Sequence, residues 1–237
     1  MKMFENLTDV AYIGEEFVKT PVRAVILTFH GLGYGGMKSG PDTDELELNA
    51  NGALCVFPYY GPWSWMNRNS RALVDEIVER VYIEFGLGED VPLIIRGGSM
   101  GGHAALNYAR YSKRRPVAVA CNCPVTDPVF HSTERTDLPR TFLLAYGMGE
   151  EPIEEVFREN SPVEQVENMP RVPYFIVHGT DDKAVSKQAH SDVFVRNMRG
   201  AGHNVEYIEA QNMGHCGFID FDIYRRWQDF VISFIKK

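Results

Sequence analysis

The chain has 237 residues, 44% of them hydrophobic and 24% charged, which is typical of a folded domain with a sizeable core. Its formal net charge of −8 at pH 7 argues against nucleic acid or an anionic membrane surface as a partner. No apolar run approaches the roughly 18 residues of a membrane span, and residues 1–10 lack the apolar stretch of a signal peptide. We therefore expect a cytoplasmic protein.

The first part of the chain alternates apolar runs with amphipathic segments. A weak pattern over Val10–Phe17 allows an edge strand, whereas Arg23–Phe29 and Ala53–Phe57 are near-continuous apolar runs typical of buried strands. Between these two, a glycine-rich loop leads into a short helix near Asp42–Asn49. Apolar residues four positions apart within Asn69–Phe85 predict a longer helix.

The same alternation continues to the C-terminus. Strand and helix patterns follow one another at Pro92–Ile95, His103–Tyr111, Pro116–Cys123, Val172–Val177, Lys187–Arg199, Val205–Glu209 and Phe221–Ile235. Short apolar strands alternating with helices predict a mostly parallel sheet with helices on both faces, that is, a three-layer α/β/α sandwich. In such sheets, ligands bind beyond the carboxyl ends of the strands.

One segment, residues 124–170, interrupts the alternation. Its prolines separate short helical patterns at Asp137–Tyr146, Ile153–Glu159 and Val163–Asn168. The segment is too long for a simple connection between two elements. We predict a single domain, residues 1–237, in which 124–170 forms a small helical cap.

The cysteines do not form a recognisable framework. Cys121 and Cys123 would point to opposite faces of a strand, which is a poor geometry for a disulfide. No grouping of cysteine and histidine has the sequence spacing of a zinc site. We expect Cys55, Cys121, Cys123 and Cys216 to be reduced, and we expect no bound metal.

The most informative stretch is the strand at Pro92–Ile95 with the GGSMGG sequence and the helix that follow it. Strand, tight turn and helix is the context of the G-x-S-x-G nucleophile elbow, with Ser99 at its apex. Gly97 and Gly101 lack the Cβ atoms that would collide at such a turn. We predict that Ser99 is a nucleophile and that the backbone N–H of Met100 faces a developing oxyanion.

A nucleophilic serine needs a base, and the base needs a carboxylate partner. Of the seven histidines, His215 is the best candidate, because it lies in a glycine-flanked loop after the last strand. Asp182, in the loop after the preceding strand, is the preferred acid. Asp181 on the same loop is the alternative, and Asp127, after an earlier strand, is a more distant one.

A second oxyanion donor should come from the loop after an early strand. The tetrapeptide HGLG occupies positions 30–33, and we predict the backbone N–H of Leu32 as the donor. His30 itself is expected to pack and to bond to the loop backbone, as is His178 at the end of another strand.

These motifs together resemble the α/β-hydrolase fold serine hydrolases of the esterase and prolyl-oligopeptidase-like group. The resemblance runs from about Arg23 to the C-terminus and includes HGLG at 30–33, GGSMGG at 97–102, HGTDDKAV at 178–185 and GH at 214–215. The N-terminal portion is too short for the usual pair of antiparallel leading strands, and 124–170 matches no cap of the group. The resemblance implies acyl transfer through a serine-bound acyl-enzyme, with no cofactor.

The leading functional interpretation is a carboxylesterase acting on small to medium or aromatic acyl esters. Tyr59, Trp63 and Trp65 share one loop, and we predict that they wall an acyl subsite, with packing against the cap as the alternative. A small peptidase or amidase is the second interpretation, in which glutamates of a cap helix would bind a free amino terminus. A non-catalytic binding protein is the third, and it is disfavoured because no triad member is missing.

Overall fold

The computed structural model describes residues 3–18, 21–147 and 151–235. At its centre is a seven-stranded sheet with the order β1-β3-β2-β4-β5-β6-β7. β1 pairs antiparallel with β3, and the other pairings between described strands are parallel. The strands are β1 Ala11–Ile13, β2 Ala24–Phe29, β3 Ala53–Pro58, β4 Leu93–Gly98, β5 Ala118–Asn122, β6 Tyr174–Gly179 and β7 Val205–Ala210.

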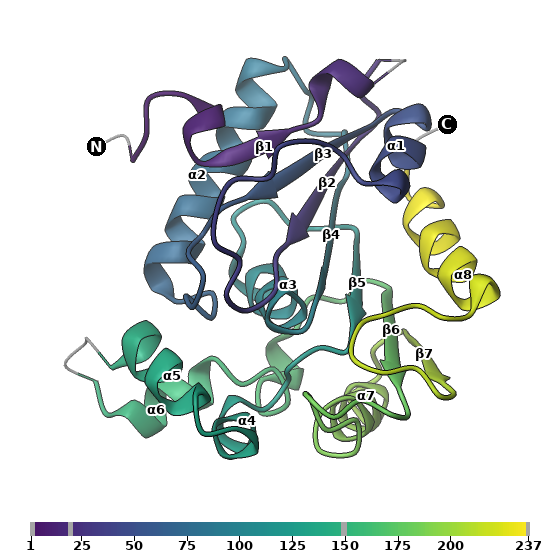
Figure 1. Ribbon diagram of the computed structural model, residues 1–237. Coiled ribbons are helices and arrows are strands. Elements are labelled where there is room, and N and C mark those ends of the chain that lie inside the picture. Colours follow the sequence, from purple (N-terminus) through teal and green to yellow (C-terminus); the bar gives the residue numbers. More distant parts are fainter. Residues whose placement is uncertain (1–2, 19–20, 148–150, 236–237) are drawn as a thin grey trace.

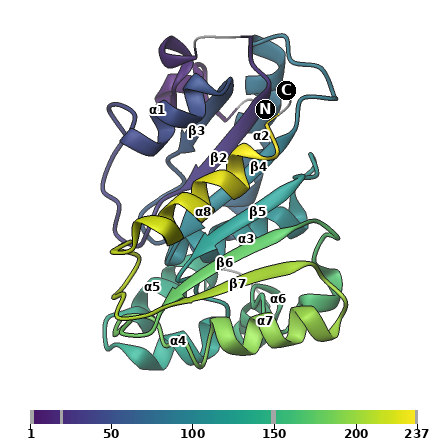
Figure 2. The same cartoon turned by 90° about the vertical axis from the view of Figure 1, so that its right-hand side faces the viewer.

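Helices cover both faces of the sheet. α1 and α8 lie on one side of it and α2 and α3 on the other (Figure 1), and α7 runs along the outer strands β6 and β7 (Figure 2). This arrangement confirms the predicted three-layer α/β/α fold. The α-helices of the described residues are α1 Thr43–Ala50, α2 Arg68–Glu84, α3 Met100–Tyr111, α4 Pro128–Glu134, α5 Leu138–Tyr146, α6 Ile153–Glu159, α7 Ser191–Gly200 and α8 Phe221–Ile232. The 3-10 helices described are Leu7–Asp9, Glu15–Phe17 and Val166–Asn168.

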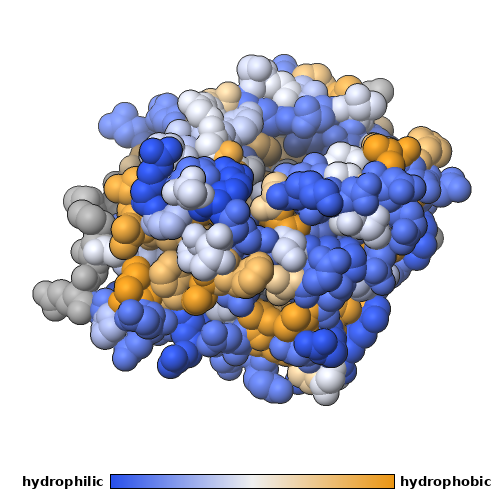
Figure 3. All heavy atoms as spheres, turned by 60° about the horizontal axis from the view of Figure 1, so that its bottom comes forward, coloured by the Kyte–Doolittle hydropathy of each residue, from blue (hydrophilic) through white to orange (hydrophobic). Residues whose placement is uncertain are grey.

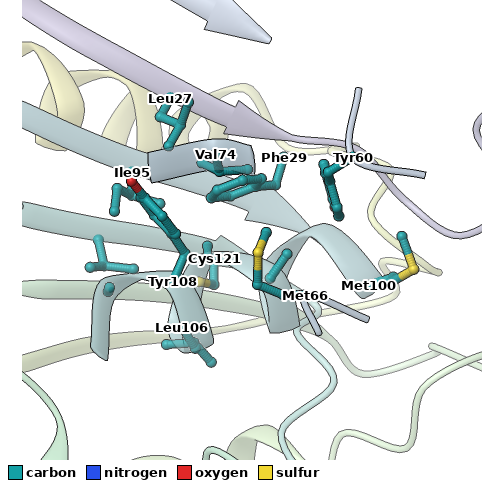
Figure 4. Packing of buried hydrophobic residues seen from close by; sticks show 14 of the residues in the cluster. Leu27, Phe29, Tyr60, Met66, Val74, Ile95, Met100, Leu106, Tyr108 and Cys121 are labelled. Carbon is teal, nitrogen blue, oxygen red and sulfur yellow. The ribbon is translucent and has the colours of Figure 1, made fainter. Parts of the chain in front are cut away.

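The core consists of two apolar layers, one on each face of the sheet. Successive strand residues point to opposite faces, so Leu27 belongs to the layer beneath α2 and α3, whereas Ile26 belongs to the layer beneath α1 and α8. Figure 4 shows the first of these layers, in which Tyr108 of α3 and Val74 of α2 lie near Leu27. The near-continuous apolar runs of the sequence follow from burial on both faces.

Several element boundaries differ from the sequence expectation, and three of these differences have a local cause. The edge strand is only three residues long, because Gly14 and a 3-10 helix end it. α3 begins at Met100 rather than His103, since the elbow turn leads straight into the helix despite two glycines of low helix propensity. α7 begins at Ser191 rather than Lys187, because the residues before it form turns and His190 is not helical.

The segment 124–170 contains α4, α5, α6 and the last 3-10 helix, while residues 148–150 lie outside the described part. The three helices gather at one end of the molecule (Figure 1). That end presents polar and apolar side chains intermixed (Figure 3). The role of the segment as a cap stays a prediction. None of the described helices is both long and apolar enough to cross a membrane.

Candidate active site

Ser99 is the single residue between β4 and α3, and its backbone is strained. Its φ of 56° and ψ of −125° are rare for a residue with a side chain. A Cβ on Gly97 would lie 2.3 Å from the carbonyl oxygen of Gly101, and a Cβ on Gly101 would lie 2.2 Å from that of Phe29. Both glycines are therefore required by backbone contacts of the turn, as a nucleophile elbow demands.

His215 and Asp182 lie in direct contact. Nδ1 of His215 donates to Oδ2 of Asp182 at 2.7 Å. The other carboxylate oxygen accepts the backbone N–H groups of Ala184 at 2.8 Å and Val185 at 3.0 Å. Burial by itself raises the pKa of Asp182, but hydrogen bonds from His178, His215 and these backbone groups hold that pKa well below its usual range. Asp182 is thus an ionised, fixed partner for the imidazole.

The pKa of His215 responds to two opposed effects. Burial lowers the pKa, whereas the hydrogen bonds and charges of Asp182 and Cys123 raise it to about 9, from an ordinary value of 6.5. Because Asp182 engages Nδ1, the ring nitrogen left to accept a proton is Nε2, which faces Cys216 Sγ at 3.8 Å. The arrangement makes His215 a stronger base than an isolated imidazole.

Ser99 and His215 line the same pocket, which has a volume of about 480 Å³. No hydrogen bond joins the two side chains among the described residues. The rest of the lining comprises Phe29, Gly31, Leu32, Gly98, Arg135 and Cys216. A pocket of about 560 Å³ around Pro92 and Val117 lies at the amino ends of β4 and β5, which is the wrong end for ligands of such a sheet.

The two predicted oxyanion donors lie on Leu32, which lines this pocket, and on Met100, which directly follows Ser99. Met100 is the first residue of α3, so its N–H has no acceptor within the helix. The N–H of Leu32 has no hydrogen-bond acceptor in the described part of the chain, whereas that of the next residue, Gly33, donates to Pro62 O at 2.8 Å. The hydroxyl of Tyr60 donates to His30 O at 2.8 Å and so holds the start of this loop. Among the described residues, neither of the N–H groups predicted as oxyanion donors therefore has a hydrogen-bond acceptor.

The prediction that Trp65 walls an acyl subsite is wrong. Its side chain is fully buried, its Nε1 donates to Thr141 Oγ1 at 2.9 Å, and its ring stacks on Phe142 with centroids 4.2 Å apart. Trp65 therefore fastens α5 to the core and cannot touch a substrate. Trp63 is 39% exposed, Tyr59 stacks near His30, and neither lines the pocket of Ser99.

The remaining candidate residues have other contacts. Asp127 caps α4 by accepting the N–H of Phe130 at 2.9 Å, and Asp181 is exposed; neither is hydrogen-bonded to His215 in the described structure. His30 and His178 are buried and bond to backbone carbonyls of Gly31 and Val185, as expected. His178 in addition contacts Asp182, with Nε2 3.2 Å from Oδ2.

The sequence did not predict that Arg135 and Cys216 line the pocket of Ser99. Arg135 follows α4 and binds Asp137 through two hydrogen bonds of 3.0 and 2.6 Å. No motif marks an arginine in the irregular segment 124–170 as facing the serine. The position of Cys216 next to His215 was a usable signal, because a residue adjoining the base must lie at the site.

Glu134 holds the end of α4 that carries Arg135. Its carboxylate accepts from Ser186 N at 2.8 Å, from His190 Nε2 at 2.9 Å and from His131 Nδ1 at 2.5 Å. Burial raises the pKa of Glu134, but these hydrogen bonds outweigh burial and lower it to about 2. An ionised Glu134 thus joins α4 to the loop that follows Asp182.

Comparisons with known proteins identify the family and the fold. The model of the prolyl oligopeptidase family matches residues 79–237. No curated protein matches the sequence. A Mycobacterium tuberculosis puromycin-hydrolyzing peptidase has a TM-score of 0.72 at 17% identity, over 92% of this chain and 34% of that one. A Pyrococcus horikoshii acylaminoacyl peptidase has a TM-score of 0.75 at 17% identity, over 92% and 38%.

A shorter protein shares the fold as well. Esterase B from Lactobacillus Rhamnosis has a TM-score of 0.69 at 13% identity, and the match covers 91% of this chain and 76% of that one. The chain spans little more than a third of the length of the two peptidases. At these identities the likeness establishes the α/β-hydrolase fold, which peptidases and an esterase share.

Proposed function

This chain belongs to the prolyl oligopeptidase family, and we propose that it is a serine hydrolase whose catalytic residues are Ser99, His215 and Asp182. One observation carries the proposal: the imidazole of His215 is held by a buried carboxylate 2.7 Å away, in the pocket that Ser99 enters from a strained turn. This is the relation of nucleophile, base and orienting acid that acyl transfer requires.

The proposed reaction begins with attack of Ser99 Oγ on the substrate carbonyl carbon, while Nε2 of His215 takes the hydroxyl proton. The N–H groups of Leu32 and Met100 then hold the tetrahedral oxyanion, and loss of one such donor typically lowers the rate by about 10²–10³. Collapse expels the leaving group, which receives the proton from Nε2. A water molecule then attacks the acyl-enzyme in the same way, with Nε2 of His215 taking its proton and passing it to Ser99 Oγ. This step releases the carboxylic acid and frees Ser99.

Asp182 does not exchange protons in this scheme. It fixes the Nδ1–H tautomer and stabilises the imidazolium that forms during both halves of the reaction. The absence of a hydrogen bond between Ser99 and His215 in the described residues is compatible with this role, because catalytic contacts of a free enzyme often tighten only when substrate binds.

We further propose that the substrates are esters rather than peptides with a free amino terminus. Recognition of an ammonium group needs a carboxylate in the pocket, and none of the described residues that line it is acidic. Glu154 and Glu155 are the cap-helix glutamates that a peptidase would use to bind a free amino terminus. Both are exposed on α6 and do not line the pocket. The pocket instead offers the apolar side chains of Phe29 and Leu32.

These apolar side chains favour an acyl group larger than acetate. Removal of apolar surface from water is worth about 25 cal/mol per Å². An additional ~60 Å² buried would therefore favour a butyryl or benzoyl group by about 1.5 kcal/mol, or roughly tenfold in kcat/KM. The proposed acyl subsite is therefore formed by Phe29 and Leu32, which line the pocket of Ser99, and not by the tryptophans.

A fluorophosphonate probe and a substrate panel test the proposal. The probe should label the wild-type protein at one serine and leave Ser99→Ala unlabelled. In the panel, p-nitrophenyl acetate, butyrate and benzoate should be hydrolysed with a higher kcat/KM than aminoacyl p-nitroanilides. Labelling that persists in Ser99→Ala would remove the nucleophile assignment, and faster cleavage of the anilides would favour a peptidase.

A further inference from the structure

Three potential metal ligands lie close together, and one of them is the proposed base, His215. The sulfur atoms of Cys123 and Cys216 and a ring nitrogen of His215 all lie within 4.8 Å of one another. We infer that this cluster binds a thiophilic divalent cation such as Zn²⁺ and that the bound metal blocks the base. The ligands come from segments about 90 residues apart in the sequence, so their spacing along the chain could not predict the site.

The fold holds the two cysteines together by several contacts. Cys123 directly follows β5, and Cys216 follows His215 in the loop after β7. The N–H of Cys216 donates to Cys123 Sγ at 3.4 Å, and Asn122 Nδ2 donates to Cys216 O at 3.1 Å. Both cysteines have positive φ, 46° and 57°, which residues with side chains rarely adopt. The loop is therefore fixed to the end of β5.

The distances suit a tetrahedral zinc site. Zinc binds sulfur at about 2.3 Å and imidazole nitrogen at about 2.1 Å, so the two ligand atoms of a tetrahedral site lie about 3.6 Å apart. Cys216 Sγ lies 3.8 Å from Nε2 of His215. Two cysteines, one histidine and an open fourth position form a donor set that zinc uses in proteins. Small side-chain movements would bring all three atoms to bonding distance.

The neighbouring groups support the ligands as they do in metal sites. Nδ1 of His215 donates to Asp182, which leaves the lone pair of Nε2 available. A carboxylate that orients a metal-binding histidine in this way is a regular feature of zinc proteins. The side chain of His215 is 30% exposed, and it lines the pocket of about 480 Å³ together with Cys216. An ion in the pocket can therefore reach His215 and Cys216, whereas the third ligand, Cys123, is fully buried.

Another cluster of potential ligands, His131, Glu134 and His190, differs because both ring nitrogens of His190 are already used in hydrogen bonds. Nδ1 of His190 accepts the backbone N–H groups of Thr126 and Asp127, both at 3.2 Å. Its Nε2 must then carry the ring proton, which it donates to Glu134 at 2.9 Å. No lone pair of His190 remains for a metal. This cluster is a hydrogen-bonded fastening of α4, whereas in the cluster at His215 the ring nitrogen Nε2 faces a thiol, Cys216 Sγ, at 3.8 Å.

Metal binding has a direct consequence for hydrolysis. The two cysteines bind as thiolates after releasing their protons to solvent. Zinc on Nε2 occupies the lone pair with which His215 would take the proton of Ser99, so the metal-bound protein cannot start acyl transfer. The inhibition rests on the proposed function, whereas the binding of the metal does not.

Titration with Co²⁺ tests the site itself. Reduced, metal-free protein should develop a thiolate-to-cobalt charge-transfer absorption band, and Zn²⁺ should abolish the band by displacement. Ser99→Ala should show the same band, since the serine is not a ligand. Cys123→Ser and Cys216→Ser should lose the band, while Cys55→Ser, whose thiol is buried in β3 outside the cluster, should keep it. Circular dichroism of each variant checks that it is folded, and Cys123→Ala serves if Cys123→Ser is not.

Zn²⁺ affinity and inhibition complete the test. By calorimetry, Asp182→Asn should bind Zn²⁺ about 10–100-fold more weakly, because the orienting carboxylate is lost. Ester hydrolysis by the wild type should fall with half-inhibition near the Zn²⁺ dissociation constant. A protein that binds metal but hydrolyses nothing would refute the proposed function and leave the site standing. No cobalt band, or a band that survives in both cysteine variants, would overturn the site.

Discussion

Asp182 and His215 are 33 residues apart in the chain, yet Oδ2 of Asp182 accepts a hydrogen bond of 2.7 Å from Nδ1 of His215. The loops that carry them are joined by backbone contacts. Asp181 N donates to Met213 O at 3.0 Å, and a Cβ on Gly179 would lie 2.1 Å from that same oxygen. Only glycine at 179 permits this approach, so the ends of β6 and β7 bring acid and base together.

The first prediction concerns the acid. Asp182→Asn should lower kcat by roughly 10⁴, because an amide favours the wrong imidazole tautomer and cannot stabilise the imidazolium. Asp181→Asn is the matched control: its side chain is exposed on the same loop, and its loss should change kcat only slightly. Steady-state hydrolysis of p-nitrophenyl butyrate measures both. A larger loss in Asp181→Asn would transfer the role of the acid to that residue.

The second prediction concerns pH. Hydrolysis needs neutral His215, and its neighbours raise the pKa of this residue to about 9 from 6.5. The kcat/KM of the wild type should therefore rise with pH through an inflection above 6.5. In Asp182→Asn the carboxylate that raises the pKa is gone, so the inflection should move to lower pH. A wild-type inflection at or below 6.5 would contradict the pairing of His215 with an ionised acid.

The third prediction separates two tryptophans of one loop. Trp65 is fully buried, so Trp65→Ala should lower the free energy of unfolding by about 3–5 kcal/mol. Trp63→Ala, at a position that is 39% exposed, should change it by less than about 1 kcal/mol. Urea unfolding followed by circular dichroism measures both values. Equal effects of the two substitutions would mean that Trp65 does not fasten α5 to the core.

The fourth prediction concerns Arg135, a cation that lines the pocket of Ser99. It is half-exposed and already pairs with Asp137, so its attraction for a substrate carboxylate is expected to be modest. Arg135→Gln should lower kcat/KM for a hemisuccinate ester by about threefold to tenfold relative to the neutral butyrate ester. Arg140→Gln, outside the pocket, should leave this ratio unchanged. A ratio unaltered in Arg135→Gln would show that Arg135 does not contact the acyl group.

The fold and part of the site could be predicted from local sequence patterns. The strands are continuous apolar runs because both faces of the sheet are covered, and the glycines around Ser99 mark the turn. Asp182 and His215 each follow a strand, and parallel strands end at one edge, so their order in the chain predicted that they meet.

The errors arose where a contact depends on distant parts of the chain. Nothing in the loop at 59–66 shows that Trp65 will be buried, because Thr141 and Phe142, which bury it, come more than 70 residues later. The same holds for Arg135, which reaches the pocket only because Glu134 is fixed to the loop beyond Asp182. The thiols of Cys123 and Cys216 likewise meet because the loop after β7 is hydrogen-bonded to the end of β5, which no local motif shows.

The central claim is that Ser99 and His215 act as one unit, and the kinetics of the double variant test it most directly. Ser99→Ala and His215→Ala should each lower kcat by several orders of magnitude, and the double variant should be little slower than either, because each loss alone already disables the same step. All three proteins should retain the circular dichroism spectrum of the wild type. If the two losses multiply in the double variant, Ser99 and His215 act independently and the account is wrong.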